Sequence, residues 1–114
     1  MTPTELLIEA RKLIEAPERW CQAQFAYTAD GRRTHAADIT ACKWCMDGAI
    51  HKVTAQRRIP AKARDECWKR LAAAVEHFGP FATSNIVSEF NDTHDHSAVL
   101  RAYARAIAAA HLMG

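Results

Sequence analysis

The stretch PAKARDECWKRLAAAVEHFGP, residues 60–80, predicts the clearest helix of the chain. Its apolar residues recur every three or four positions, the spacing that gathers side chains on one face of a helix. Pro60 suits a helix start, and Gly79-Pro80 is the order of residues that ends a helix. The expected inward face consists of Ala63, Cys67, Leu71, Ala74, Val75 and Phe78.

A helix is also predicted at the N-terminus, over residues 2–16. Thr2 can cap it, Pro3 fits its first turn, and Glu5 stands at the position that completes a capping box. Pro17 ends the pattern because its ring cannot continue a helix.

The C-terminal part of the chain predicts two more helices. A short one runs from Ser84 or Asn85 to Phe90, and polar residues 91–96 then form a loop. Ser97 caps the last helix, whose inward residues are Val99, Leu100, Tyr103, Ile107 and Ala110.

The middle of the chain is less regular. Residues 24–28 alternate between polar and apolar, and Asp30-Gly31 favours a tight turn, so we expect a short β-hairpin around residues 22–34. A second helix is predicted from about Asp38 to Val53, followed by a polar connection over residues 54–59. Its inner stripe consists of small residues that allow another helix to approach closely, and these are Ala41, Cys42, Cys45, Gly48 and Ala49.

These elements predict an all-α or mostly α fold of four to five helices with one short hairpin. The chain has 114 residues. A chain of this length buries about 60–70% of its unfolded surface as one domain, whereas two domains would each have too little core. We therefore expect a single helical domain over residues 1–114.

Charge and cysteine content bear on the compartment. Fifteen Lys and Arg against thirteen Asp and Glu leave a net charge of +2, and there are four cysteines. The first residues lack the basic and apolar pattern of a secretory signal, and no apolar run approaches the roughly 20 residues that cross a bilayer. A cytoplasmic protein with reduced thiols and no membrane contact is expected.

Several residues together resemble a known family. Trp20 opens the hairpin, Asp30-Gly31 forms its tip, and Trp44-Cys45-x-x-Gly48-Ala49 follows. An Asn91-Asp92 pair then precedes the last helix. This pattern resembles a family of short, uncharacterised bacterial and phage proteins, catalogued as a domain of unknown function. The resemblance implies a shared fold and carries no activity with it.

The four cysteines and six histidines allow two kinds of chemistry. Cys42 and Cys45 have the Cys-x-x-Cys spacing of zinc and dithiol sites, and His94 with His96 could supply two more metal ligands. Cys45 could also act as a nucleophile, with His94 or His96 as its base and Asp92 or Asn91 orienting the ring. No second Cys-x-x-Cys is present, so burial of these thiols as small apolar groups is the favoured interpretation and no cofactor is expected.

Basic residues concentrate over residues 52–70, with seven cations against two carboxylates. Arg57, Arg58 and Lys62 could contact phosphates without reading sequence. The charged outer face of the 60–80 helix explains the same residues, so nucleic-acid binding remains an alternative.

The leading hypothesis is a cytoplasmic binding or interaction module without catalytic activity, whose partner is another protein or a second copy of the chain. In it Trp44, Cys45, Gly48 and Ala49 form a close-packing contact between two helices, and Asn91 with Asp92 stops a helix and caps a turn. A thiol- or metal-dependent enzyme built from Cys45, Asp92 and His94 is the alternative from a different class.

Overall fold

The computed structural model describes residues 1–112, and the side chains of residues 1–110. Within that range the chain forms five α-helices and one small sheet, which confirms a mostly α fold with a short hairpin. The helices are α1 (Pro3–Leu13), α2 (Met46–Arg57), α3 (Ala61–Val75), α4 (Ile86–Thr93) and α5 (His96–Leu112). The strands are β1 (Ala26–Thr28), β2 (Arg33–Thr34) and β3 (Ala41–Trp44), and two 3-10 turns occupy Pro17–Arg19 and Glu76–Phe78.

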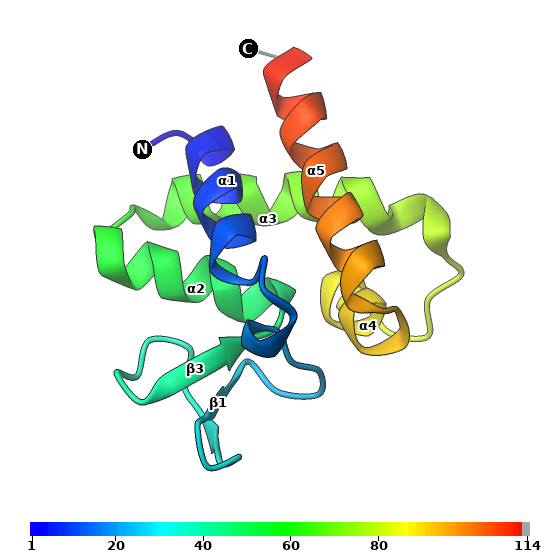
Figure 1. Cartoon of the computed structure of the whole chain (residues 1–114). Helices are drawn as coiled ribbons and strands as arrows, with labels where there is room; N and C mark the ends of the chain where they lie inside the picture. The colour runs from blue at the N-terminus through cyan, green and yellow to red at the C-terminus, as the bar shows by residue number, and fades with distance from the viewer. Residues whose placement is uncertain (113–114) are drawn as a thin grey trace.

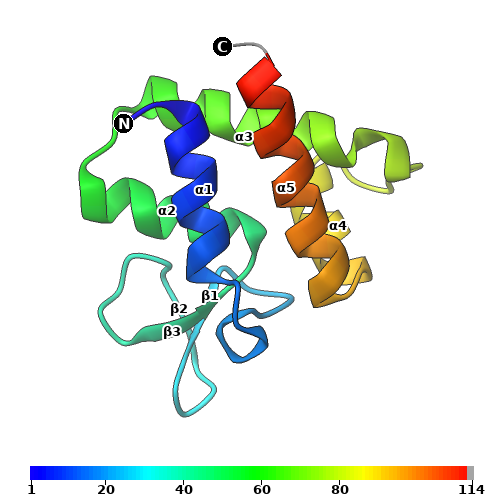
Figure 2. The same ribbon diagram turned by 45° about the horizontal axis from the view of Figure 1, so that its top comes forward.

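The helices form two crossed layers. Helices α1 and α5 lie side by side across α2 and α3, and α4 lies beneath one end of α5 (Figures 1 and 2). The sheet covers the end of the molecule opposite to the chain's N-terminus, next to the start of α2 (Figure 1). No helix in the described residues combines the length and the apolar character that crossing a bilayer requires.

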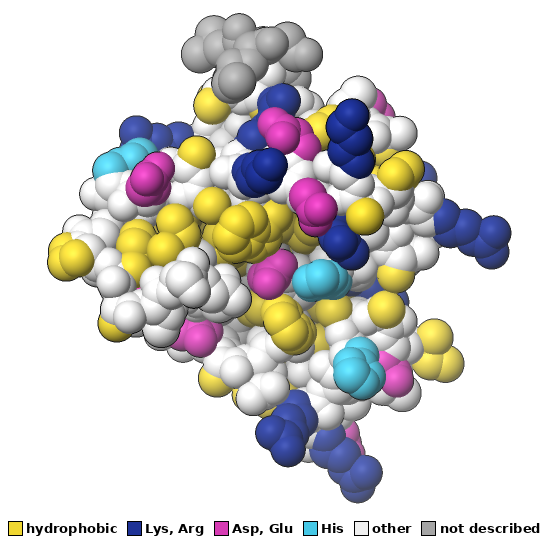
Figure 3. All heavy atoms as spheres, turned by 180° about the vertical axis from the view of Figure 1, so that it is seen from behind, with side chains coloured by type: hydrophobic (Ala, Val, Ile, Leu, Met, Phe, Trp, Pro, Cys, Tyr) yellow, Lys and Arg dark blue, Asp and Glu magenta, His cyan; other side chains and the backbone are white. Residues whose placement is uncertain are grey.

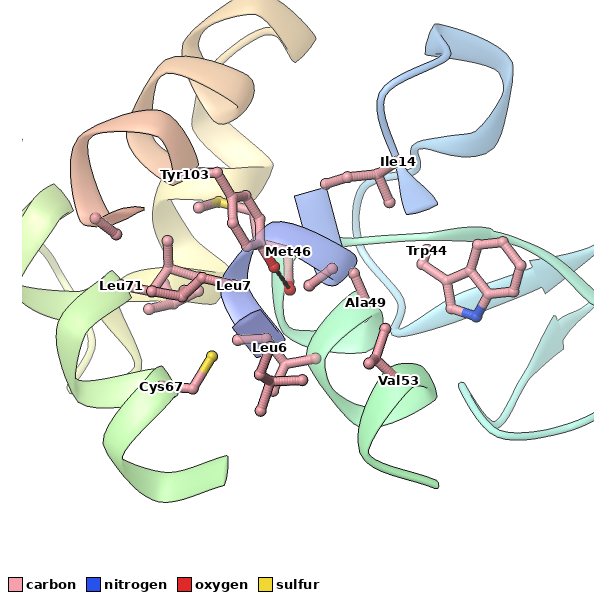
Figure 4. Close-up of a cluster of buried hydrophobic side chains, with 14 of the residues drawn as sticks. Leu6, Leu7, Ile14, Trp44, Met46, Ala49, Val53, Cys67, Leu71 and Tyr103 are labelled. Carbon is pink, nitrogen blue, oxygen red and sulfur yellow. Dashed lines mark hydrogen bonds between the residues drawn. The ribbon is translucent and has the colours of Figure 1, made fainter. Parts of the chain in front are cut away.

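The core lies where these layers meet. Leu6 and Leu7 of α1, Met46 of α2, Leu71 of α3 and Tyr103 of α5 are fully buried there (Figure 4). The Tyr103 hydroxyl donates a hydrogen bond of 2.5 Å to the Met46 carbonyl oxygen, so the one polar atom of this large side chain is satisfied inside the core.

The expected capping box at the N-terminus is present. The Thr2 hydroxyl accepts from the Glu5 backbone N–H at 3.1 Å, and the Glu5 carboxylate accepts from the Thr2 N–H at 3.3 Å. These two bonds satisfy amides that a helix start leaves without partners.

The hairpin is present and gains a third strand. Strand β1 pairs antiparallel with β2 on one side and with β3 on the other, giving the order β2-β1-β3. Gly31 adopts φ +84° in the turn, a conformation that costs other residues strain.

The predicted helix from Asp38 to Val53 is wrong in its first half. Residues 41–44 form β3, and α2 begins at Met46 and continues to Arg57, through most of the expected connection. Ala41 by itself favours a helix, but pairing with β1 overrides this local preference and satisfies backbone groups that a two-stranded ribbon exposes.

The predicted loop over residues 91–96 is also mostly helical. Helix α4 extends to Thr93 and α5 begins at His96, so Asn91 and Asp92 lie inside a helix and do not end it. Side-chain contacts made by these two residues, described below, explain why the helix continues through them.

Candidate functional site

The buried side chain of Asn91 joins the loop at residues 20–21 and the start of α2 to its own helix, α4. Its Oδ1 accepts from Trp20 Nε1 at 2.8 Å and from the Met46 backbone N–H at 3.0 Å. Its Nδ2 donates to the Cys21 carbonyl at 3.0 Å and to Asp92 Oδ1 at 3.1 Å. An asparagine amide has two donors and two acceptor positions, so every one of them is used inside the protein.

Asp92 holds the loop before β1. Its Oδ1 accepts from the backbone N–H of Ala23 at 2.8 Å, and Ala23 has φ 75°, a left-handed conformation that few side chains adopt. The Gln22 amide adds bonds of 3.0 Å each to the carbonyls of Asn91 and His94. The Asn-Asp pair therefore fastens residues 20–24 to α4.

Cys45 is the N-cap of α2. Its Sγ accepts from the Gly48 backbone N–H at 3.2 Å, and its own N–H donates to the Phe25 carbonyl at 3.2 Å. Burial raises the pKa of the Cys45 thiol to about 11. Burial likewise raises the pKa of Cys21 and of Cys67 to about 12.

The close contact expected at Gly48 is made with a different element than predicted. A Cβ on Gly48 would stand 2.0 Å from the Phe25 carbonyl oxygen, so the first turn of α2 lies directly on the backbone that enters β1. The prediction of a second helix at this point is wrong. Trp44 nearby donates from Nε1 to the Ala36 carbonyl at 2.9 Å.

The residues considered for thiol chemistry are only partly gathered. Cys45 and Asp92 line one pocket of about 130 Å³. His94 does not line it: its ring stacks on Phe90 with centroids 4.0 Å apart, and its Nδ1 lies 3.0 Å from the Phe90 carbonyl. His96 lies 2.7 Å from the Ile14 carbonyl through Nε2.

No three His, Cys, Asp or Glu side chains converge as metal ligands in the part of the chain that the structure describes. Cys42 is half-buried on β3, and the two histidines proposed to complete its site are engaged as just described.

The basic residues considered for phosphate contact are spread over the α2–α3 connection. Arg57 Nη2 lies 3.9 Å from the Glu9 carboxylate, and Arg58, in a left-handed conformation, is the C-cap of α2. Lys62 lines a broad groove beside α3 together with Asp65 and Glu66, so carboxylates alternate with the cations there.

A second polar site lies around Asp47, in the first turn of α2. This carboxylate is 8% exposed, and its Oδ1 lies 3.5 Å from His51 Nε2 one turn along the helix. Arg64 of α3 is close enough to influence it. Burial raises the pKa of Asp47, an effect that His51 and Arg64 partly offset.

Three hollows meet at this second site. A pocket of about 320 Å³ is lined by Asp47, Ile50, His51, Arg64, Asp65, Trp68 and Asn85. Trp68 also borders a hollow towards α4, and His51 with Arg64 borders another towards Phe25. Figure 3 shows this face, where acidic, basic and histidine side chains meet at the edge of a hydrophobic band.

The comparisons with known proteins give one match. A family model described as a family of unknown function, DUF6197, matches residues 1–109. The chain belongs to DUF6197. No curated protein and no solved structure matches it.

Membership of DUF6197 leaves both sites of this chain without an assigned role. Sequence reasoning singled out Asn91 and Asp92, but as a pair that stops a helix and not as a hydrogen-bond network, and it missed the Asp47 site. The signal for the latter was the i, i+4 spacing of Asp47 and His51. The helix expected from Asp38 placed both residues outside its small-residue stripe.

Proposed function

We propose that this DUF6197 domain is a small binding module without catalytic activity, in which the Trp44–Ala49 segment and the Asn91-Asp92 pair build the fold. The observation that carries the proposal is the full use of the Asn91 amide, with four hydrogen bonds to Trp20, Cys21, Met46 and Asp92. A side chain that hydrogen-bonds a substrate needs a free donor or acceptor, and the Asn91 amide has none left.

The state of Cys45 supports the same proposal. A thiol with a pKa of about 11 has on the order of one molecule in 10⁴ as thiolate at pH 7, and the thiolate is the nucleophile. Its Sγ also serves as the cap of α2. The alternative, an enzyme using Cys45 with Asp92 and His94, requires His94 to leave its stacking contact with Phe90.

The finer parts of the proposal concern partner and compartment. We place the domain in the cytoplasm of a bacterium or phage-infected cell, and free thiols at all four cysteines support a reducing compartment. The partner is another protein or a second copy of the chain. The alternative is nonspecific nucleic-acid binding through Arg57, Arg58 and Lys62. The carboxylates that neighbour Arg57 and Lys62 argue against it, because they would repel phosphate groups.

The proposal is tested by thiol reactivity. The protein is treated at pH 7.5 with a chromogenic disulfide reagent, in its native state and in denaturant, and the labelled cysteines are identified by peptide mass spectrometry. We expect fast native labelling at half-buried Cys42 alone, and labelling of Cys21, Cys45 and Cys67 after unfolding. A Cys42→Ser variant isolates the three buried thiols. Native labelling of Cys45 at the rate of a free thiol or faster would overturn the proposal.

A further inference from the structure

We propose that the pocket around Asp47 binds an organic cation, the guanidinium or ammonium group at the end of an aliphatic chain. This inference rests on the proposed function as a binding module and names the chemistry of its ligand. Three features of the pocket carry it: a largely buried carboxylate whose open accepting positions are reached only by solvent, paired neighbouring charges, and apolar walls.

Asp47 is 8% exposed as a residue and 10% as a side chain, and its carboxylate contacts His51 alone among the described residues. No fully buried polar side-chain atom there lacks a hydrogen-bond partner, so the accepting positions still open on Asp47 are ones that solvent reaches. Among the described residues, His51 is the one basic side chain within 4 Å of this carboxylate, with 3.5 Å between His51 Nε2 and Asp47 Oδ1. The imidazole is charged only when it is protonated. Buried carboxylates in proteins normally accept several hydrogen bonds. Since Asp47 lines the 320 Å³ pocket, the accepting positions still available to it face the space that a ligand would fill.

The other charges around the pocket already have partners. Arg64 Nη2 lies 3.3 Å from Asp65 Oδ1, so these two residues of α3 neutralise each other. At the α4 side of the pocket, Asn85 Oδ1 accepts from the Ser88 backbone N–H. With the Arg64–Asp65 pair set aside, the pocket presents one net negative charge from Asp47, which complements a cation.

The walls suit the apolar stem of such a ligand. Ile50 and the half-buried Trp68 line the pocket, and a hollow next to it extends past His51 to the exposed ring of Phe25. A volume of about 320 Å³ lies within the range of small-ligand pockets. Aromatic faces and methylene groups pack well together, and a cation near an indole gains further attraction.

The burial of Asp47 also carries a cost that a ligand would relieve. Burial raises its pKa, which means that the surroundings of Asp47 disfavour the charged carboxylate. A bound cation with N–H donors replaces the lost solvation. Groups held in such a state are frequent at binding sites.

The experiment is calorimetric titration of the full chain with two probes. Agmatine represents a free small molecule, and an acetylated, amidated Ala-Arg-Ala peptide represents an arginine carried by a polypeptide. We expect at least one of them to bind, and the tighter probe identifies the source of the cation. Failure of both to bind at up to about 10 mM would overturn the inference.

Three variants test the role assigned to each charge. Asp47→Asn keeps the shape of the side chain and should weaken binding at least about 30-fold. Arg64→Gln removes a competing cation and should leave affinity unchanged or higher. Glu18→Gln, which removes the charge of an exposed carboxylate outside the pocket, is the control and should change affinity less than about threefold.

Two results would contradict the inference even if a probe binds. One is Asp47→Asn binding as tightly as the natural chain. The other is loss of binding in Arg64→Gln together with binding of inorganic phosphate, which would make the pocket an anion site. Failure of the proposed function is separate: a reactive native Cys45 would refute the non-catalytic module, whereas inert thiols with no cation binding would refute the pocket alone.

Discussion

Gly48 lies against the carbonyl group of Phe25 so closely that a Cβ at position 48 would be 2.0 Å from the oxygen and 2.9 Å from the carbon. The same carbonyl accepts the Cys45 N–H at 3.2 Å. The start of α2 and the chain entering β1 are therefore joined by one hydrogen bond and one contact that no side chain can enter. This contact joins the sheet to the helical part of the fold.

Gly48→Ala is predicted to destabilise the protein by about 3 kcal/mol or more, at or above the upper end for overpacking, because the obstructing atoms belong to the backbone. The measurement is the free energy of unfolding in denaturant. Gly31→Ala is the matched control: nothing lies within 4 Å of its Cβ position, and only its φ of +84° makes alanine costly, by about 1–2 kcal/mol. Equal losses in the two variants would refute the steric role of Gly48.

Asn91→Asp is predicted to destabilise the protein by more than about 3 kcal/mol although it changes a single atom of the side chain. The new oxygen would face the Cys21 carbonyl and the Asp92 carboxylate, where Nδ2 now donates. Asn85→Ala in the same helix is the control, since it removes one long N-cap bond of 3.4 Å and should cost about 1 kcal/mol. A loss for Asn91→Asp no larger than that of the control would contradict the network.

The large helices could be predicted from sequence and the sheet could be predicted only in part. Residues 60–80 carry apolar side chains at helical spacing, and only a helix gathers residues with that spacing on one face. Residues 41–44 include two small residues and one aromatic residue, and this pattern fits the period of a helix as well as that of a strand. Pairing with β1 decides their strand conformation, and β1 lies outside the short stretch of sequence from which a local pattern is read.

The candidate sites follow the same division. The resemblance to a family pattern identifies a structural group of residues, namely Trp44, Cys45, Gly48, Asn91 and Asp92. Their contacts could not be predicted from the sequence, because these contacts join positions up to 71 residues apart. The Asp47 pocket could not be predicted because α3 supplies its other wall. Helical spacing shows that Asp47 and His51 share a face and says nothing of what covers it.

Cys45→Ser is predicted to leave stability within about 1 kcal/mol of the natural protein, because a serine hydroxyl is a favoured N-cap acceptor. Cys45→Ala removes the acceptor for the Gly48 N–H and should cost about 1–2 kcal/mol more than Cys45→Ser. Unfolding in denaturant measures both. If the two variants were equally stable, the capping role of the Cys45 sulfur would be refuted.

Asp47→Asn is predicted to raise the melting temperature at pH 7. Burial raises the pKa of Asp47, so the folded state binds its proton more tightly than the unfolded state, and stability falls as pH rises above the usual value of 3.8 towards the raised one. Asparagine does not ionise and avoids this loss. The advantage of the variant should therefore shrink as the pH is lowered towards 3.8 and below. Thermal unfolding across this pH range measures it, with exposed Asp65→Asn as the control that should show little change. A lower melting temperature for Asp47→Asn at pH 7 would mean that His51 and Arg64 more than compensate for the burial of the charge.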